Sequence, residues 1–150
     1  MVQWNTPGGM CVIQVEGAGS PQTEEAVVAT VALDKGNFEE TIASNGVVLV
    51  DFWASWCGPC RMFAPIYEAA SEKHGDVVFA KVDTEAEPEL AAHFEIMSIP
   101  TLMAFRDQVL LYAQPGALPG ARLEDLLSKV KSLDMDDIRR QIEEQTRAAS

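Results

Sequence analysis

The sequence has little cysteine, little positive charge and no long hydrophobic run. It contains three cysteines, and 11 basic residues stand against 23 acidic ones, for a net charge of −12. The densest basic cluster is the pair Arg139-Arg140, whereas a nucleic-acid-binding surface needs a broader basic patch. No apolar run approaches the roughly 18 residues that a membrane span requires. We therefore expect neither nucleic acid nor membrane as a partner.

The beginning of the sequence lacks the order of a secretory signal. Its first basic residue is Lys35, so no charged segment precedes an apolar one. Three cysteines do not make the disulfide framework of a small secreted protein, and in a reducing compartment a close pair is more often catalytic or metal-binding. We expect a cytoplasmic protein. Met10 is a second candidate for the true start of the chain.

The length of 150 residues suits one domain with a real core. Residues 1–25 hold four glycines and two prolines with little periodicity, and we predict a flexible leader there. Residues 26–133 are expected to form the domain. Residues 134–150 are expected to form a C-terminal helical extension.

From residue 27 the hydrophobic pattern predicts alternating strands and helices. Strands are expected at 27–33, 47–53, 76–83, 101–106 and 109–113, and helices at 34–44, 58–74, 87–94 and 121–133. Alternation implies parallel strands, and a hairpin turning at Asp107-Gln108 implies an antiparallel part. The predicted fold class is therefore α/β, with a central mixed β-sheet sandwiched by α-helices.

The extension is predicted to be a helix over residues 134–147. Asp134 can cap its N-terminus. Two ion pairs at i,i+4 spacing are expected, Asp136 with Arg140 and Glu143 with Arg147, each contributing roughly 0.2–0.5 kcal/mol. The apolar stripe of this helix is thin, so it can lie on the domain, pair with a partner or fray.

Two of the three cysteines stand three residues apart in "WCGPC", residues 56–60. Cys57 falls where a buried strand turns into a helix, and the unpaired N–H groups and dipole of a helix N-terminus lower a thiol's pKa. Gly58 permits a tight turn, and Pro59 suits a first helical turn. Cys60 then lies on the same face, within a small adjustment of disulfide distance. Such a pair can attack a disulfide and resolve the product.

Two other interpretations of the cysteine pair are weaker. A metal site needs two further ligands, and only Cys11, His74 and His93 remain, scattered along the chain. We interpret Cys11 as a spare thiol and both histidines as surface or helix-end residues. A purely structural disulfide would close a loop too short to restrict the unfolded chain much.

The segments "VLVDFWASWCGPCRMFAPIYEAA", "KVDTE", "IPTLMAFR" and "PGAL" resemble the thioredoxin family, in order, from about Val31 to Leu133. The resemblance implies a thioredoxin fold and a protein-disulfide reductase without a cofactor of its own. It implies that Cys57 is the nucleophile and Cys60 the resolving thiol. It further implies a monomer that reduces disulfide-containing proteins and is recycled by an NADPH-dependent thioredoxin reductase. The chain has no GxGxxG fingerprint for a nicotinamide or flavin cofactor.

Three further residues match catalytic positions of that family. Asp51 matches a buried carboxylate, and an acid within "VVLVDFW" is expected to be desolvated, which raises its pKa and suits proton exchange with Cys60. The alternative is an Asp tolerated through a local hydrogen bond. Lys81 matches the lysine near that carboxylate, or is simply a solvent-facing strand lysine. Pro100 matches the family's cis-proline beside the disulfide.

The resemblance also implies an apolar substrate platform around the cysteines. Beside Pro100 it comprises Trp56, Gly58, Pro59, Ser98, Ile99, Gly116 and Ala117. Core packing is the alternative for Trp56, although it suits Trp53 better. The chain departs from the family at Gln108, where a hairpin glycine is frequent, and at Pro115, which lacks the N–H of the more usual β-branched residue.

Two alternative functions remain open at this point. A thioredoxin-fold chaperone could hold clients with the extra helix and use its redox chemistry secondarily. An oxidase or isomerase would use the same cysteines at a different redox poise. The Gly-Pro between the cysteines and the missing export signal favour a reductant.

Overall fold

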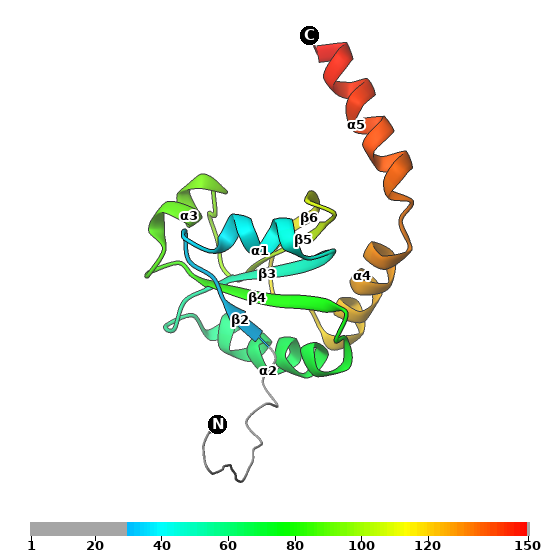
Figure 1. The fold of residues 1–150 in the computed structure, drawn as a ribbon. Helices are drawn as coiled ribbons and strands as arrows, with labels where there is room; N and C mark the ends of the chain where they lie inside the picture. Colours follow the sequence, from blue (N-terminus) through cyan, green and yellow to red (C-terminus); the bar gives the residue numbers. More distant parts are fainter. Residues whose placement is uncertain (1–29, 150) are drawn as a thin grey trace, which may run out of the picture.

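The computed structural model describes residues 30–149 (Figure 1). The strands are β2 (Thr30–Ala32), β3 (Val47–Trp53), β4 (Val77–Asp83), β5 (Thr101–Arg106) and β6 (Val109–Pro115). The helices are α1 (Phe38–Ser44), α2 (Gly58–Lys73), α3 (Pro88–His93), α4 (Gly120–Ser132) and α5 (Met135–Ala149). The predicted order of strands and helices is confirmed. The predicted leader lies outside the described residues, as do the first residues of the strand predicted at 27–33.

The five strands form one mixed sheet in the order β2-β4-β3-β5-β6. β2, β4 and β3 run parallel, and β5 and β6 run antiparallel, as the sequence predicts. Helices cover both faces of the sheet (Figure 1). β3 is the middle strand, and its five central residues are all buried. Burial on both faces explains why its sequence is apolar at every position except Asp51.

The two faces of β3 pack into separate cores because successive side chains point to opposite sides of a sheet. Leu49 joins Phe63 of α2 and Leu123 of α4 in one core. Val50 joins Phe38 of α1 in the other. Asp51 has the parity of Leu49, so its carboxylate lies on the side of the sheet that α2 covers. This places a carboxylate beneath the helix that carries the cysteines.

α5 begins on the domain and then leaves it. Asp134 Oδ1 accepts hydrogen bonds from the N–H groups of Asp136 (3.0 Å) and Asp137 (3.2 Å), which confirms the predicted cap. Met135 is buried, and Arg139 forms an ion pair with Asp107 of the hairpin turn at 3.3 Å. The C-terminal part of α5 projects away from the sheet (Figure 1).

The ion pairs predicted within α5 are wrong. Arg139 pairs with Asp136, and Arg140 pairs with Asp137, so both pairs have i,i+3 rather than i,i+4 spacing. Asp136 therefore pairs with Arg139, which also reaches Asp107 on the hairpin, and Arg140 pairs with Asp137 instead. The salt bridges of residues 30–149 do not include the expected pair at 143 and 147.

No helix among residues 30–149 has the length and apolar character needed to cross a membrane.

Candidate active site

The cysteine pair occupies the turn between β3 and α2. Cys57 is the N-cap of α2, with extended backbone angles (φ −85°, ψ 114°), and Pro59 lies in the first turn. The backbone N–H of Cys60 donates to Cys57 Sγ at 3.2 Å, so the sulfur takes the place of the usual capping oxygen. Cys57 and Cys60 are joined by a disulfide, with their Cα atoms 5.2 Å apart. Both are almost fully buried.

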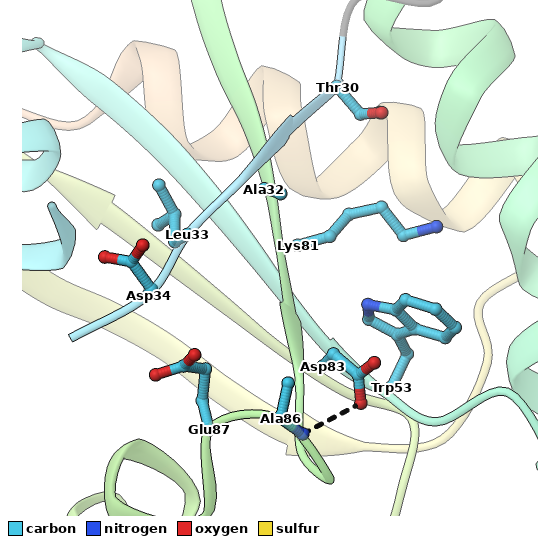
Figure 2. Close-up of a pocket in the computed structure, with 9 residues that line it drawn as sticks. All are labelled: Thr30, Ala32, Leu33, Asp34, Trp53, Lys81, Asp83, Ala86 and Glu87. Atoms are coloured by element: carbon cyan, nitrogen blue, oxygen red, sulfur yellow. Dashed lines mark hydrogen bonds between the residues drawn. The ribbon is translucent and has the colours of Figure 1, made fainter. Parts of the chain in front are cut away.

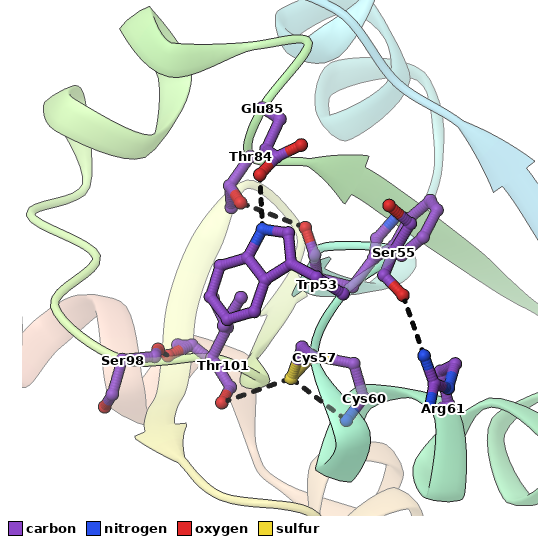
Figure 3. The surroundings of a disulfide bond; sticks show 11 residues. Trp53, Ser55, Cys57, Cys60, Arg61, Thr84, Glu85, Ser98 and Thr101 are labelled. Carbon is purple, nitrogen blue, oxygen red and sulfur yellow. Dashed lines mark hydrogen bonds between the residues drawn. A yellow bond between two sulfur atoms is a disulfide. The ribbon is translucent and has the colours of Figure 1, made fainter.

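The loop before β5 lies directly against this disulfide. The Ile99–Pro100 peptide bond is cis, as the resemblance implies, and Pro100 is buried. Cys57 Sγ lies 3.7 Å from the Ile99 carbonyl oxygen, and Figure 3 shows Ser98 and Thr101 on the same side of the cysteines. The Gly116 N–H donates to the Pro100 carbonyl at 2.7 Å. Its φ of +107° favours glycine at this position.

Exposed apolar side chains are found around the buried disulfide. Trp56 is 64% exposed, so core packing is the wrong interpretation for it, and its Nε1 donates to Glu85. Gly58, Pro59 and Ala117 are also exposed. Sequence reasoning missed two exposed methionines that are close to the site in the sequence, Met62 at 73% exposure and Met97 at 93%. Met62 follows "CGPC" by two residues, and Met97 directly precedes "SIPT".

Asp51 is buried with 1% of its surface exposed, and neither carboxylate oxygen has a hydrogen-bond partner. A local hydrogen bond therefore does not explain this residue. Burial raises the pKa of Asp51 to about 7, partly offset by the positive charge of Lys81. On the α2 side, the pKa of the buried Tyr67 is also raised, by burial first and by Asp51 second. The carboxyl of Asp51 therefore changes its charge near neutral pH.

Lys81 lies beside Asp51 in the sheet, because the two residues are register partners across β3 and β4. It is half-buried, and its Nζ lies 4.9 Å from the centroid of the Trp53 ring. Lys81 and Trp53 line a pocket of about 360 Å³ (Figure 2). Sequence reasoning placed Trp53 in the core, whereas the structure places it half-buried on the wall of this pocket.

The histidines lie at helix ends, as predicted. His74 ends α2, where its Nε2 lies 2.8 Å from Glu124 and its Nδ1 lies 2.9 Å from Lys131 Nζ. His93 ends α3 and is exposed. Within residues 30–149 no group of three or more His, Cys, Asp or Glu side chains could hold a metal ion. Cys11 lies outside the described residues.

Comparison with known proteins agrees with this geometry. The Thioredoxin family model matches residues 29–131. The chain is 56% identical over 119 residues to a protein named putative thioredoxin 2 from Streptomyces coelicolor, covering 79% of this chain and 89% of that protein. It is 45% identical over 104 residues to a thioredoxin from Alicyclobacillus acidocaldarius, covering 66% of this chain and 99% of that protein.

Solved structures give the same result. A mutant thioredoxin from Halobacterium salinarum superposes with a TM-score of 0.65 at 30% identity, covering 70% of this chain and 93% of that one. A thioredoxin from Plasmodium falciparum superposes with a TM-score of 0.62 at 33% identity, covering 66% of this chain and 97% of that one.

The fold and the cysteine pair define a thiol–disulfide oxidoreductase. The chain belongs to the thioredoxin family, and it acts by dithiol–disulfide exchange at Cys57 and Cys60.

Proposed function

We propose that the protein reduces disulfides in other proteins, with Cys57 as the nucleophile and Cys60 as the resolving thiol. The observation that supports this assignment is the position of Cys57 at the N-terminus of α2, where its sulfur accepts the Cys60 N–H and faces the Ile99 carbonyl. The same N–H group stabilises negative charge on Cys57 once the disulfide is reduced. Cys60 lies one turn further along, within bonding reach of Cys57.

The chemistry proceeds in two balanced exchanges. The Cys57 thiolate attacks one sulfur of a substrate disulfide, forming a mixed disulfide and releasing the other substrate sulfur as a thiolate. Cys60 then loses its proton and attacks Cys57 Sγ. This breaks the mixed disulfide, releases the second substrate thiolate and forms the Cys57–Cys60 disulfide. Two electrons pass from the protein to the substrate.

Asp51 is proposed as the base that takes the proton of Cys60 in the second exchange. Its burial on the α2 side of the sheet and its pKa of about 7 support this role, because a base works best with a pKa near the working pH. Lys81 is proposed to tune that carboxyl by its positive charge, and Pro100 to fix the loop that faces Cys57.

The exposed residues around the disulfide are proposed to bind the substrate. They are the exposed Trp56, Gly58, Pro59, Ser98, Gly116 and Ala117 and the half-buried Ile99, and we add the exposed Met62 and Met97 to this proposal. Their support is location, since they surround a disulfide that is itself almost buried. Apolar and methionine side chains suit contact with many different partners.

We further propose recycling by an NADPH-dependent thioredoxin reductase, a monomeric state and a cytoplasmic location. Membership of the thioredoxin family supports the reductase, and a protein that donates electrons to disulfides needs a reducing compartment. The division into a leader (1–25), a domain (26–133) and a helical extension (134–150) is likewise a proposal.

The experiment that tests the function is insulin reduction coupled to NADPH through a bacterial thioredoxin reductase. Turnover should disappear in Cys57→Ser, and Cys60→Ser should accumulate mixed disulfides with substrate. Reduction that survives in Cys57→Ser would contradict the assignment. Reduction with dithiothreitol but not with the reductase would leave the disulfide chemistry intact and refute only the proposed electron donor.

A chaperone is the second candidate function, because α5 projects from the domain with Ile142 exposed. The variant to test it ends at Leu133. Loss of aggregation suppression with unchanged insulin reduction would favour the chaperone. Unchanged suppression would exclude α5 as the surface that holds clients.

A further inference from the structure

Four residues at the ends of β3 and β4 form a square on one face of the sheet. Asp51 pairs with Lys81, and Trp53 pairs with Asp83, so the lysine has a carboxylate beside it and an indole diagonally opposite. In the structure the ammonium of Lys81 lies over the indole, with Nζ 4.9 Å from the ring centroid. Figure 2 shows the lysine extending toward Trp53 within the pocket. Of these two neighbours, Lys81 therefore interacts with the indole of Trp53.

Asp51 is left without a direct partner by this arrangement. Both of its oxygens lack a hydrogen bond, so Lys81 acts on it only through space. An ammonium and a buried carboxylate that are register partners would ordinarily be expected to form an ion pair, because buried charges in proteins are generally paired. A cation over an indole is a competing interaction, which contributes about 0.5–2 kcal/mol depending on how far the cation is desolvated.

We propose that Trp53 is a positioning residue, whose indole holds the Lys81 ammonium away from Asp51 and so keeps that carboxyl able to accept a proton. Without the indole, Lys81 would form the ion pair with Asp51. An ion-paired carboxylate is a weaker base, and it would accept the proton of Cys60 less readily near neutral pH. This catalytic consequence rests on the proposed role of Asp51.

The other charged groups facing Lys81 are less available to it. Asp34, Asp83 and Glu87 line the same pocket. Each of these carboxylates already accepts a backbone N–H: Asp34 from Gly36 and Asn37, Asp83 from Glu85 and Ala86, and Glu87 from Lys35. Tyr67 of α2, which Asp51 influences through its charge, donates its hydroxyl to the Ala80 carbonyl. Asp51 is therefore the one carboxylate of this group without a donor among the described residues.

The test is an NMR titration of the Asp51 carboxyl carbon in the full-length oxidised protein, where the cysteines do not titrate and no substrate is needed. Trp53→Leu should move the midpoint down by about one pH unit, because it releases Lys81 toward the carboxylate. Lys81→Met should move the midpoint up. The double variant Trp53→Leu/Lys81→Met should show no downward shift relative to Lys81→Met alone.

The combined variant separates the proposal from its alternative. If Trp53 acted only by excluding water, its removal would lower the midpoint in both backgrounds, and the proposal would be overturned. An unchanged or raised midpoint in Trp53→Leu would overturn the proposal as well, since it would mean that the released Lys81 does not pair with Asp51. Trp56→Leu is the matched control, because that indole binds Glu85 and should leave the titration unchanged.

Trp53→Phe provides the test again if the leucine variant does not fold. Phenylalanine keeps an aromatic face that binds a cation more weakly. The Asp51 midpoint in Trp53→Phe should therefore lie below that of the wild-type protein by less than the shift expected for Trp53→Leu. This downward shift should be absent when Lys81 is replaced by Met. The pH profile of mixed-disulfide resolution should move with the midpoint. A profile that stays fixed while the NMR midpoint moves would refute the role of Asp51 but leave the Trp53–Lys81 contact standing.

Discussion

The indole Nε1 of Trp56 donates a hydrogen bond to the carboxylate of Glu85. Trp56 belongs to the turn before α2, and Glu85 to the turn after β4. The bond therefore joins the two loops that follow β3 and β4, at the carboxyl ends of these neighbouring strands. It holds a largely exposed indole in one orientation beside Cys57, and such preorganisation lowers the entropic cost of binding a partner.

Glu85→Ala should weaken substrate binding, because it frees the Trp56 side chain. We expect KM for insulin to rise about three-fold with kcat nearly unchanged, in line with the roughly 0.5–1.5 kcal/mol of one hydrogen bond. Steady-state reduction assays measure both constants. Glu89→Ala is the control, since Glu89 is exposed and pairs with Lys35. An equal rise in KM in the control would point to net charge instead of indole orientation.

Asp51 should make folding stability depend on pH. Its pKa is raised from 3.8 to about 7 by burial, so the folded state binds the proton more tightly than the unfolded state. Stability should therefore be greatest below pH 4 for this group and fall as the pH rises toward 7, by on the order of 4 kcal/mol in total. Asp51→Asn should lose this dependence and be relatively more stable at pH 8.

Urea unfolding of the oxidised protein at several pH values between 4 and 8 measures that dependence. The comparison is the difference between wild-type and Asp51→Asn curves, so that other titrating groups cancel. A constant difference across the window would show that Asp51 does not titrate there. In the reduced protein, Asp51→Asn should also slow mixed-disulfide resolution without unfolding the chain.

The sequence predicts most of the site because its chemistry is local. The turn that holds Cys57, Gly58, Pro59 and Cys60 follows from a buried strand meeting a helix start, and the structure contains it. The desolvation of Asp51 follows from its apolar neighbours in β3. The contact of Trp53 with Lys81 and the exposure of Met97 depend on strand register and loop path, which a linear pattern does not contain. They could be found only once the sheet was assembled.

His74 joins two helices that the sequence places far apart. Its Nε2 meets Glu124 of α4, its Nδ1 meets Lys131, and its ring lies near Phe79. His74→Ala should lower the free energy of unfolding by about 1–2 kcal/mol, because it removes the contacts with Glu124 and Lys131 and leaves a gap at the end of α2. Chemical denaturation measures the loss. His93→Ala, at an exposed helix end, should change stability by less than about 0.5 kcal/mol, and equal losses in the two variants would contradict the bridging role.

Gln108 occupies the one hairpin position where the sequence departs from the usual turn chemistry. Asp107 and Gln108 have φ values of +52° and +71°, the left-handed conformation at both turn residues, which glycine adopts without steric cost. Gln108→Gly should therefore stabilise the protein by about 0.5–1 kcal/mol, because the relief of the left-handed strain exceeds the extra freedom that glycine gives the unfolded chain. Asp107 is a poor site for the same change, because it pairs with Arg139 and anchors α5. Asp107→Gly relieves the same strain but breaks that pair, so thermal unfolding should show a smaller gain than in Gln108→Gly. If Gln108→Gly instead lowered the melting temperature, the Gln108 side chain would have to stabilise the hairpin by more than the left-handed turn costs.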